Sequence, residues 1–175
     1  YFDGSYLKTG SGASVVLTSP QGHKLCYAIH LHFDATNNIA DYDALVNGLR
    51  IAVEVGARRL LVRGDSKLVV NQVMKAMEPR DPKMCAYYGE VRKLEEKFKG
   101  FELHHSYRRF NARADLLSTI ASVQNPVSDN VFTSNLYEPS IKIKPLEEVS
   151  GKVADDQVTP EAQAQGLVVT TNQQD

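Results

Sequence analysis

Four aspartates within the first 115 residues have the residue type and the setting that metal-dependent chemistry needs. Each lies in a different short segment, and the four are Asp3, Asp41, Asp65 and Asp115. Carboxylates on separate strands and helices can converge into one oxygen-rich pocket, which is what a pair of hard divalent cations requires. The leading hypothesis from these residues is therefore a metal-dependent phosphodiester chemistry.

Each aspartate also has a purely structural explanation. Asp65 could cap a helix that begins near residue 66, and Asp41 could be favoured in a first turn by the helix dipole. Asp115 could be a solvated helix residue. Asp3 is the hardest to explain in this way, because an acid within a central strand is costly without a partner. The order and the combination of the four favour a shared site more than any single one does.

The first third of the chain has the pattern of antiparallel strands. Residues 1–6, 15–18 and 25–33 are predicted as strands, and the Pro-Gln-Gly run at 20–22 supplies a turn between the last two. The sequence therefore predicts three antiparallel strands here, joined in part by a hairpin.

The following residues, up to 122, alternate between helical and strand patterns. Helices are predicted over 38–55, 66–77, 82–97 and 112–121, and strands over 59–63 and 101–107. This order predicts an α/β fold with a mixed five-stranded sheet, three strands antiparallel and two parallel, flanked by helices. Asp3 is then expected on a central strand. Asp65 is expected at the carboxyl end of the parallel neighbour, where such sheets bind ligands.

Length and composition predict one small globular unit. The chain has 175 residues, of which 42% are hydrophobic, enough for one core. It has no run of 18 apolar residues and no secretory signal pattern. The two cysteines, Cys26 and Cys85, form no disulfide or zinc pattern. We therefore expect an intracellular protein that is not secreted and has no membrane partner.

Charge and composition change after residue 122. Residues 1–122 hold 17 Lys and Arg against 13 Asp and Glu, whereas residues 123–175 hold 3 against 8. The basic surplus of the first part is compatible with a polyanionic partner. The second part mixes prolines with polar and acidic residues and shows no sustained periodicity. The sequence therefore predicts a domain over residues 1–122 and a flexible spacer over residues 123–175, dispensable for folding.

The segments around the four aspartates resemble the ribonuclease H family, and most of all the ribonuclease H domain of plant gypsy-type LTR retrotransposon polyproteins. The likeness covers residues 1–122 and rests on YFDGS at 1–5, TNNIAD at 36–41, LLVRGDSKLVV at 60–70 and NARAD at 111–115. The later residues are similar to the spacer that leads to an integrase. The resemblance thus implies a piece of a polyprotein with reverse transcriptase and integrase domains, in the cytoplasm or in virus-like particles.

By the same resemblance, the expected activity is hydrolysis of the RNA strand of an RNA–DNA hybrid with two Mg²⁺ ions, which Mn²⁺ could replace. The implied catalytic residues and metal ligands are Asp3, Asp41, Asp65 and Asp115. Contacts to the hybrid are implied in its minor groove, where 2′-hydroxyls mark the RNA strand. The implied nucleic-acid-binding residues are Gly4, Ser5, Asn37, Asn38, Ser66, Arg109 and Arg113.

Two departures from the family pattern bear on activity. Asp41 stands where the family carries glutamate, so its carboxylate is set back by about one C–C bond, roughly 1.5 Å. Cellular members carry a histidine in a longer loop before the last aspartate, and we assign that role to neither His104 nor His105. The alternative is a catalytically inactive ribonuclease H-like module that binds nucleic acid or serves structurally. A third hypothesis, a DNA-cutting integrase or resolvase, is disfavoured by the Asp-Gly-Ser and Asn-Asn segments.

Overall fold

The computed structural model describes residues 1–8, 10–123, 125–126, 128–141 and 171–172. Its strands are β1 (Phe2–Leu7), β2 (Gly10–Thr18), β3 (Lys24–Leu31), β4 (Arg59–Gly64), β5 (Gly100–His105), β6 (Val131–Leu136) and β7 (Thr171–Asn172). Its helices are α1 (Asn37–Glu54), α2 (Lys67–Met74), α3 (Pro82–Glu95), the 3₁₀ turn η1 (Arg108–Phe110) and α4 (Ala112–Ser122). The helices and strands predicted up to residue 122 are thus confirmed.

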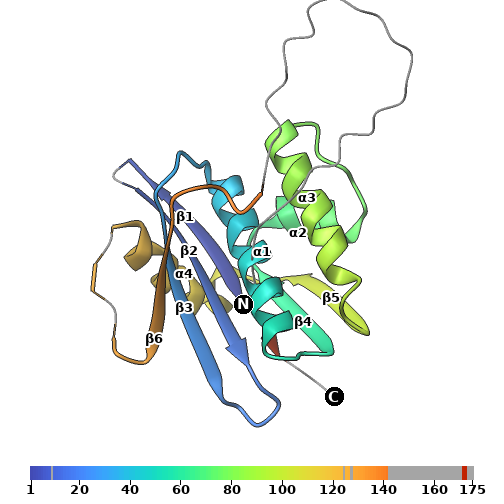
Figure 1. The fold of residues 1–175 in the computed structure, drawn as a ribbon, viewed down its shortest axis with the longest axis horizontal. Coiled ribbons are helices and arrows are strands. Elements are labelled where there is room, and N and C mark those ends of the chain that lie inside the picture. The colour runs from blue at the N-terminus through green and yellow to red at the C-terminus, as the bar shows by residue number, and fades with distance from the viewer. Residues whose placement is uncertain (9, 124, 127, 142–170, 173–175) are drawn as a thin grey trace, which may run out of the picture.

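One mixed sheet forms the centre of the molecule (Figure 1). Strands β1, β2 and β3 are antiparallel neighbours, β4 lies parallel to β1, and β5 lies parallel to β4. This arrangement confirms the predicted α/β fold with three antiparallel and two parallel strands flanked by helices. Two strands were not predicted. Strand β6 adds to the sheet parallel to β3, and the two-residue β7 pairs with β2 and β4.

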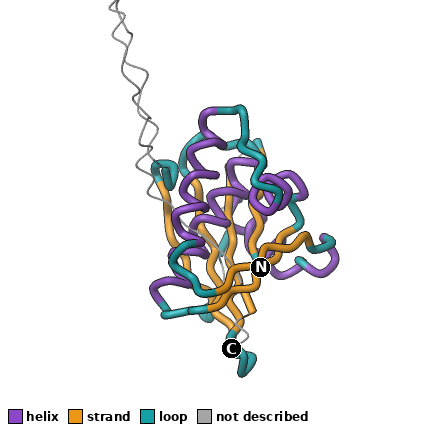
Figure 2. Tube along the Cα trace, turned by 90° about the vertical axis from the view of Figure 1, so that its right-hand side faces the viewer, coloured by secondary structure: helices purple, strands orange, loops and turns teal. Residues whose placement is uncertain are grey.

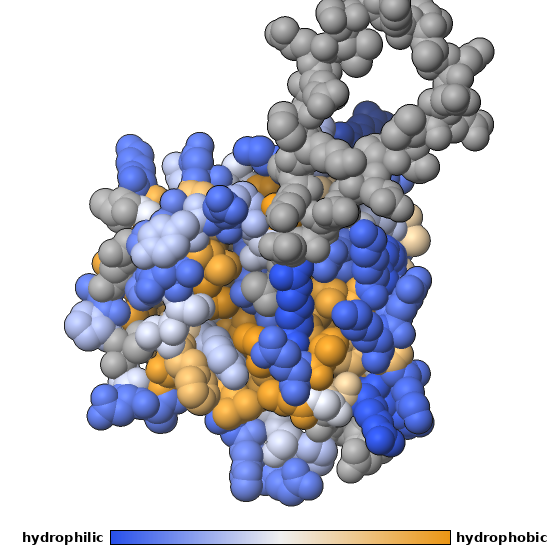
Figure 3. Space-filling view, viewed as in Figure 1, coloured by the Kyte–Doolittle hydropathy of each residue, from blue (hydrophilic) through white to orange (hydrophobic). Residues whose placement is uncertain are grey.

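Helices cover both faces of the sheet (Figure 2) because alternate residues of the central strands point to opposite sides. In β2, Val15 and Leu17 belong to the larger core, which also contains the buried faces of α1, α2 and α3. Val16 between them belongs to a smaller core with Ala114 and Leu117 of α4. On the α1–α3 side, apolar surface gathers at the centre, with hydrophilic side chains around it (Figure 3).

The first three helices begin at side chains that cap their free N–H groups. Thr36 accepts a hydrogen bond from Ile39 N at 3.2 Å, and Ser66 accepts one from Val69 N at 3.3 Å. Asp81 accepts from two backbone N–H groups at the start of α3. Because Ser66 performs the capping in α2, the carboxylate of the preceding residue is left for another role.

Glycine lets helix α1 approach strand β1 very closely. A Cβ at Gly4 would lie 2.2 Å from the carbonyl carbon of Ala40 and 2.3 Å from the backbone N of Asp41. On the opposite face, a Cβ at Gly12 would lie 2.3 Å from the carbonyl oxygen of Ser118 in α4. Only residues without a side chain fit these positions. The two helices that carry candidate acids are therefore held against the β1–β2 pair.

Residues 131–141 pack against the domain, where the sequence analysis predicted only a flexible spacer. Strand β6 pairs with β3 along six residues, from Val131 beside Cys26 to Leu136 beside Leu31. Ile141 is buried in the larger core. The sequence pattern misses this strand because four of its six side chains are exposed, so it has little apolar periodicity. The rest of the proposed spacer, residues 142–170 and 173–175, lies outside the described residues.

A buried polar network attaches this segment to α1. Asp43 accepts hydrogen bonds from the hydroxyl groups of Tyr87 and Ser140 and, at 3.2 Å, from Asn47 Nδ2. Arg50 reaches the carbonyl oxygen of Ser140 at 3.4 Å. Ser140 is therefore an anchor of the segment that follows β6.

The structure also describes both cysteines and the apolar character of the helices. Both cysteines are free thiols, Cys26 buried and Cys85 half-buried. Among the described residues, none of the helices has the length and apolar character to cross a bilayer.

Candidate metal centre

Three of the four predicted acids converge on one point of the structure. Asp3 on β1, Asp41 on α1 and Asp65 just after β4 each offer a carboxylate oxygen, and these oxygens lie within 4.8 Å of one another. Asp3 and Asp41 are buried, and Asp65 is half-buried. The sequence analysis expected such a convergence from acids on separate elements, and the structure places these three as expected.

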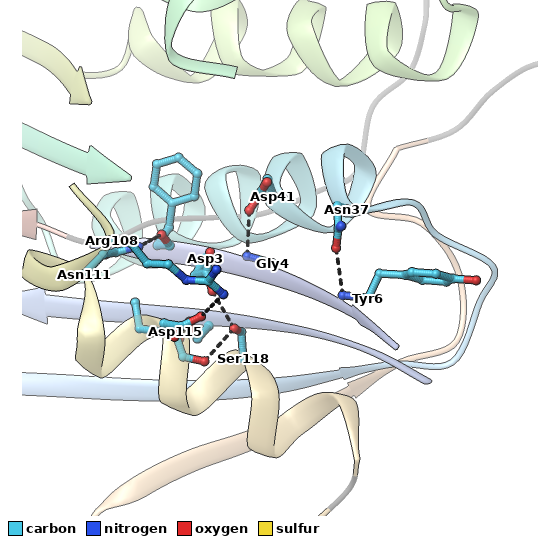
Figure 4. Close-up of polar contacts among 12 residues, drawn as sticks. Asp3, Gly4, Tyr6, Asn37, Asp41, Arg108, Asn111, Asp115 and Ser118 are labelled. Carbon is cyan, nitrogen blue, oxygen red and sulfur yellow. Dashed lines mark hydrogen bonds and ion pairs between the residues drawn. The ribbon is translucent and has the colours of Figure 1, made fainter. Parts of the chain in front are cut away.

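The convergence follows from strand order and from the close approach of α1. The single β1–β4 pairing joins Phe2 to Gly64, so the next residue of each strand, Asp3 or Asp65, reaches the same end of the sheet. Helix α1 lies over β1 at Gly4, and the Gly4 N–H donates a 2.8 Å hydrogen bond to Asp41 Oδ1 (Figure 4). This bond fixes the carboxylate of Asp41 above the strand that carries Asp3.

Burial and mutual repulsion raise the pKa values of the two buried carboxyl groups. Desolvation raises the pKa of Asp3 far above its usual range, and the neighbouring charges of Asp41 and Asp65 raise it further. Desolvation raises the pKa of Asp41 to about 8, although the Gly4 N–H opposes the shift. Carboxylates whose pKa values are raised by burial and by neighbouring negative charge lack a compensating positive charge. A bound cation would supply that charge.

The fourth predicted acid, Asp115, lies at the edge of this group. It is half-buried in the first turn of α4, and its Oδ1 accepts a hydrogen bond from Arg108 Nη2 at 3.2 Å (Figure 4). Asp115 and the three converging acids all line one pocket of the structure. The structure thus places Asp115 beside the cluster, and Asp3, Asp41 and Asp65 form its centre.

Helix α4 also supports the cluster through residues that the sequence analysis missed. Ser118 Oγ donates a 2.7 Å hydrogen bond to Asp3 Oδ2. Asn111 Nδ2 donates to the carbonyl oxygen of Phe2 at 3.0 Å, and Asn111 Oδ1 is buried with no partner among the described residues. A Ser at three positions after Asp115 is a weak signal on its own. The hydrogen bond of Ser118 becomes visible only when α4 is docked across β1.

The pocket holds several of the predicted nucleic-acid-binding residues. Gly4, Ser5, Asn37 and Ser66 line it. The amide oxygen of Asn37 already accepts a 3.0 Å hydrogen bond from Tyr6 N. The other predicted residues are Asn38, Arg109 and Arg113, and they do not line the pocket. Asn38 is half-buried, and both arginines are exposed on the η1–α4 side.

The remaining lining residues are not among the assigned site residues. They come from β1, α2, the end of β5 and the η1–α4 segment: Tyr6, Leu7, Lys67, His105, Tyr107, Arg108 and Thr119. His105 ends β5, in agreement with the expectation that it belongs to the strand. The signals for these residues are positional. They flank the four aspartates in sequence or lie at the ends of the same elements.

The donor set suits a hard divalent cation. Three converging carboxylates give an all-oxygen site, which matches Mg²⁺ or Mn²⁺ and offers no sulfur or imidazole ligand for a softer metal. Neighbouring negative charges help to raise the pKa values of Asp3 and Asp41, and a bound cation would oppose that shift. The residues therefore fit a divalent metal ion held by Asp3, Asp41 and Asp65.

Several solved structures that are similar to this one are ribonucleases H. The ribonuclease H1 of the halophilic archaeon Halobacterium salinarum superposes with a TM-score of 0.62 at 33% identity, over 69% of this chain and 93% of that one. LC11-RNase H1, solved in complex with an RNA/DNA hybrid, superposes with a TM-score of 0.61 at 26% identity, over 71% of this chain and 95% of that one. Fold and acid cluster together thus define a ribonuclease H-like domain.

The sequence comparisons agree with the structural ones. This chain belongs to the reverse transcriptase-like family, whose model matches residues 1–121. It is 35% identical to Ribonuclease HI of Halobacterium salinarum over 123 residues, which are 69% of this chain and 62% of that protein. It is also 36% identical over 87 residues to a bifunctional protein of Mycobacterium tuberculosis, of which it spans 24%. The chain thus spans less than two thirds of these relatives.

Proposed function

We propose that this chain hydrolyses the RNA strand of RNA–DNA hybrids at the centre formed by Asp3, Asp41 and Asp65, with Asp115 beside them. The observation that carries the proposal is the convergence of three carboxylate oxygens within 4.8 Å, from three separate elements of a ribonuclease H fold. The solved complex of LC11-RNase H1 with a hybrid supports the choice of substrate. The family match and the archaeal ribonuclease HI support the class of reaction.

The chain's own residues would bind, orient and shield the reacting phosphate. Asp3, Asp41 and Asp65 would hold two Mg²⁺ ions, or Mn²⁺ in their place, with Asp115 completing the ligand set. When bound, such ions supply an activated water and neutralise the charge of the departing oxygen. Ser118 orients Asp3 through Oδ2, and the Gly4 N–H orients Asp41 through Oδ1.

Recognition of the hybrid would use groups around the same pocket. The backbone at Gly4 and Ser5 and the amides of Asn37 and Asn38 can donate to and accept from 2′-hydroxyls in the wide minor groove. Ser66 stands at the start of α2 beside Asp65. Arg109 in η1 and Arg113 in the first turn of α4 are exposed and are suited to phosphates of the backbone. Base identity would then have little influence on cleavage.

We further propose that the domain works within a retroelement polyprotein, beside reverse transcriptase and integrase domains, in the cytoplasm or in virus-like particles. The likeness of residues 1–122 to such domains and the match to the reverse transcriptase-like family support this context. Sequencing the genomic reading frame on both sides should reveal a reverse transcriptase upstream and an integrase downstream. Unrelated flanking frames would contradict the context without touching the proposed activity.

The test of the activity is a cleavage assay on the purified chain. A labelled RNA–DNA hybrid should be cut in the RNA strand when Mg²⁺ or Mn²⁺ is added, and should stay intact in EDTA. The matched variant Asp65→Asn, which keeps size and one acceptor oxygen, should lose the activity. Equal cleavage by both proteins would contradict the assignment. An intact hybrid with every metal would favour the alternative of an inactive nucleic-acid-binding module, and cleavage of DNA duplexes would favour an integrase-like enzyme.

A further inference from the structure

Two aromatic rings are left in water beside the metal centre. Tyr107 precedes η1 and is 64% exposed, and Phe110 ends η1 and is 61% exposed. Tyr107 lines the same pocket as the acid cluster. Exposed rings of this size are costly to keep in water unless a partner covers them, and function commonly provides that partner.

The rings belong to a row of neighbouring planar groups. The rings of His105 and Tyr107 meet edge to face at 5.7 Å. The guanidinium of Arg109 lies 5.6 Å from the centre of the Tyr107 ring and 4.7 Å from that of Phe110. We call His105, Tyr107, Arg109 and Phe110 the ring platform. Arg109 makes no ion pair with any of the residues that the structure describes.

The ring platform is fixed to the strands that carry the acids. Ser106 N donates a 2.8 Å hydrogen bond to the carbonyl oxygen of Gly64, the residue before Asp65. At the other end, the side chain of Asn111 donates to the carbonyl oxygen of Phe2, the residue before Asp3. Both ends of the loop are therefore tied to the residues next to the catalytic candidates. A ligand on the platform would have a defined position relative to the metal centre.

We propose that the ring platform binds an unpaired nucleobase in a single-stranded segment that adjoins the hybrid at the metal centre. Planar rings backed by an unpaired guanidinium match the flat, electron-rich face of a base and the phosphate beside it. Inside a duplex the faces of the bases are covered by their neighbours, and only their edges remain accessible. Exposed rings bind a base by stacking on its face, so the ligand of the ring platform is a base outside the duplex. The proposal rests on the proposed function and adds a preference for hybrids with a single-stranded extension.

The test compares two substrates by fluorescence anisotropy in Ca²⁺, with a gel to verify that they stay intact. One is a blunt hybrid, and the other is the same hybrid with a six-nucleotide single-stranded extension on one strand, made in each of the possible polarities. The chain should bind one extended hybrid about 5- to 100-fold more tightly than the blunt one, the range that stacking of one base gives. The variant Phe110→Ala, whose ring does not line the pocket of the acid cluster, should weaken this preference and retain its affinity for the blunt hybrid, and Tyr107→Ala/Phe110→Ala should lose the preference.

A matched control removes two other exposed rings. Phe132→Ala/Tyr137→Ala takes away side chains that are 55% and 71% exposed, on and just after β6, and should keep the preference. A second readout is 2-aminopurine placed at each position of the extension, whose fluorescence the platform should quench at one or two positions only. Circular dichroism of each variant verifies equal folding.

The outcomes separate this proposal from the proposed function. Cleavage of the blunt hybrid tests the metal centre, and the ratio of the two affinities tests the platform. Equal affinity for blunt and extended hybrids in every polarity would overturn the proposal, even if cleavage is normal. A preference that survives in full in both Phe110→Ala and Tyr107→Ala/Phe110→Ala, or an equal loss of affinity for both substrates in Phe110→Ala, would overturn it too. A platform that serves a protein partner would leave all nucleic-acid affinities unchanged, which also overturns it.

Discussion

Asp41 and Asp43 are buried aspartates two positions apart on the same helix, and their surroundings differ in kind. Asp41 faces the carboxylates of Asp3 and Asp65, and one backbone N–H donates to it. Asp43 faces donors only, from the hydroxyl groups of Tyr87 and Ser140 and the amide of Asn47. One acid is therefore left with excess negative charge in a pocket, and the other completes a packed network.

The pKa values reflect this difference. Desolvation raises both, but Asp41 rises to about 8 beside other acids, whereas donated hydrogen bonds and Arg50 hold Asp43 to about 6. Burial therefore does not by itself mark a functional acid, because both are buried. What separates them is whether the partners are like charges around a pocket or donors that satisfy the carboxylate.

The largest effect should appear when the same substitution is made at both positions. Asp41→Asn keeps the size and the acceptor for Gly4 N, yet it should lower hybrid cleavage at least about 100-fold, since even loss of a metal ligand's supporting partner costs 10- to 100-fold. Asp43→Asn should change the rate per folded molecule by less than about threefold. Rates at saturating Mg²⁺ measure both. Similar losses at the two positions would remove the distinction between the acids.

The second effect concerns the segment that supplies Ser140. A chain ending at Ser122 should lose at least about 2 kcal/mol of stability, because β6 is removed, Val131 and Ile141 lose their burial, and Asp43 loses a donor. For this chain length the melting temperature should fall by about 4–8 °C. A chain ending at Ile141 is the matched control and should stay close to the full chain. If both chains melt with the full one, residues 131–141 are dispensable as the sequence pattern had suggested.

The acid cluster can be predicted from the sequence to a greater extent than the hydrogen-bond network around Asp43. Asp3, Asp41 and Asp65 lie at recognisable points, on a central strand, near the start of a helix and just after a strand, so their convergence follows from the order of the elements. Asp43 carries no such signal, because two of its donors are distant in sequence: Tyr87 in α3, and Ser140, which is 97 positions away. Strand β6 was not predicted for the same reason. Its place is set by pairing with β3, and its own side chains are mostly exposed.

A smaller gain is expected from lengthening Asp41. The resemblance to ribonucleases H implies a glutamate at this position, and about 1 Å of misplacement can cost on the order of 100-fold in rate. Helix α1 already approaches β1 closely at Gly4, which recovers part of the missing length. We therefore predict that Asp41→Glu raises hybrid cleavage about 10-fold. Helix propensity differs by only a few tenths of a kcal/mol between the two residues, too little to produce that gain. An unchanged or lower rate, with equal folding by circular dichroism, would show that Asp41 is already well placed or is not a ligand.

The smallest effect is on the pH dependence of stability without metal. The raised pKa of Asp41 means that the folded chain binds more protons than the unfolded chain between about pH 4 and pH 8. Stability in EDTA should therefore fall as pH rises through this window, by up to about 1 kcal/mol per pH unit for one group. Asp43, with its pKa near 6, contributes with the same sign only at the lower end. Urea unfolding between pH 6.5 and 8 should show a flatter slope for Asp41→Asn and an unchanged slope for Asp43→Asn. Parallel curves for all three proteins would argue against a strained cluster.

The central claim is that one group of buried acids holds divalent cations and the other does not. Titration of Mn²⁺ into the protein, followed by the electron paramagnetic resonance signal of the free ion, counts bound cations directly and requires no substrate. We expect saturable Mn²⁺ binding by the wild-type chain and by Asp43→Asn, competition by Mg²⁺, and a loss of binding in Asp41→Asn and Asp65→Asn. Equal Mn²⁺ binding by all four proteins, or none by the wild-type chain at millimolar Mn²⁺, would contradict it.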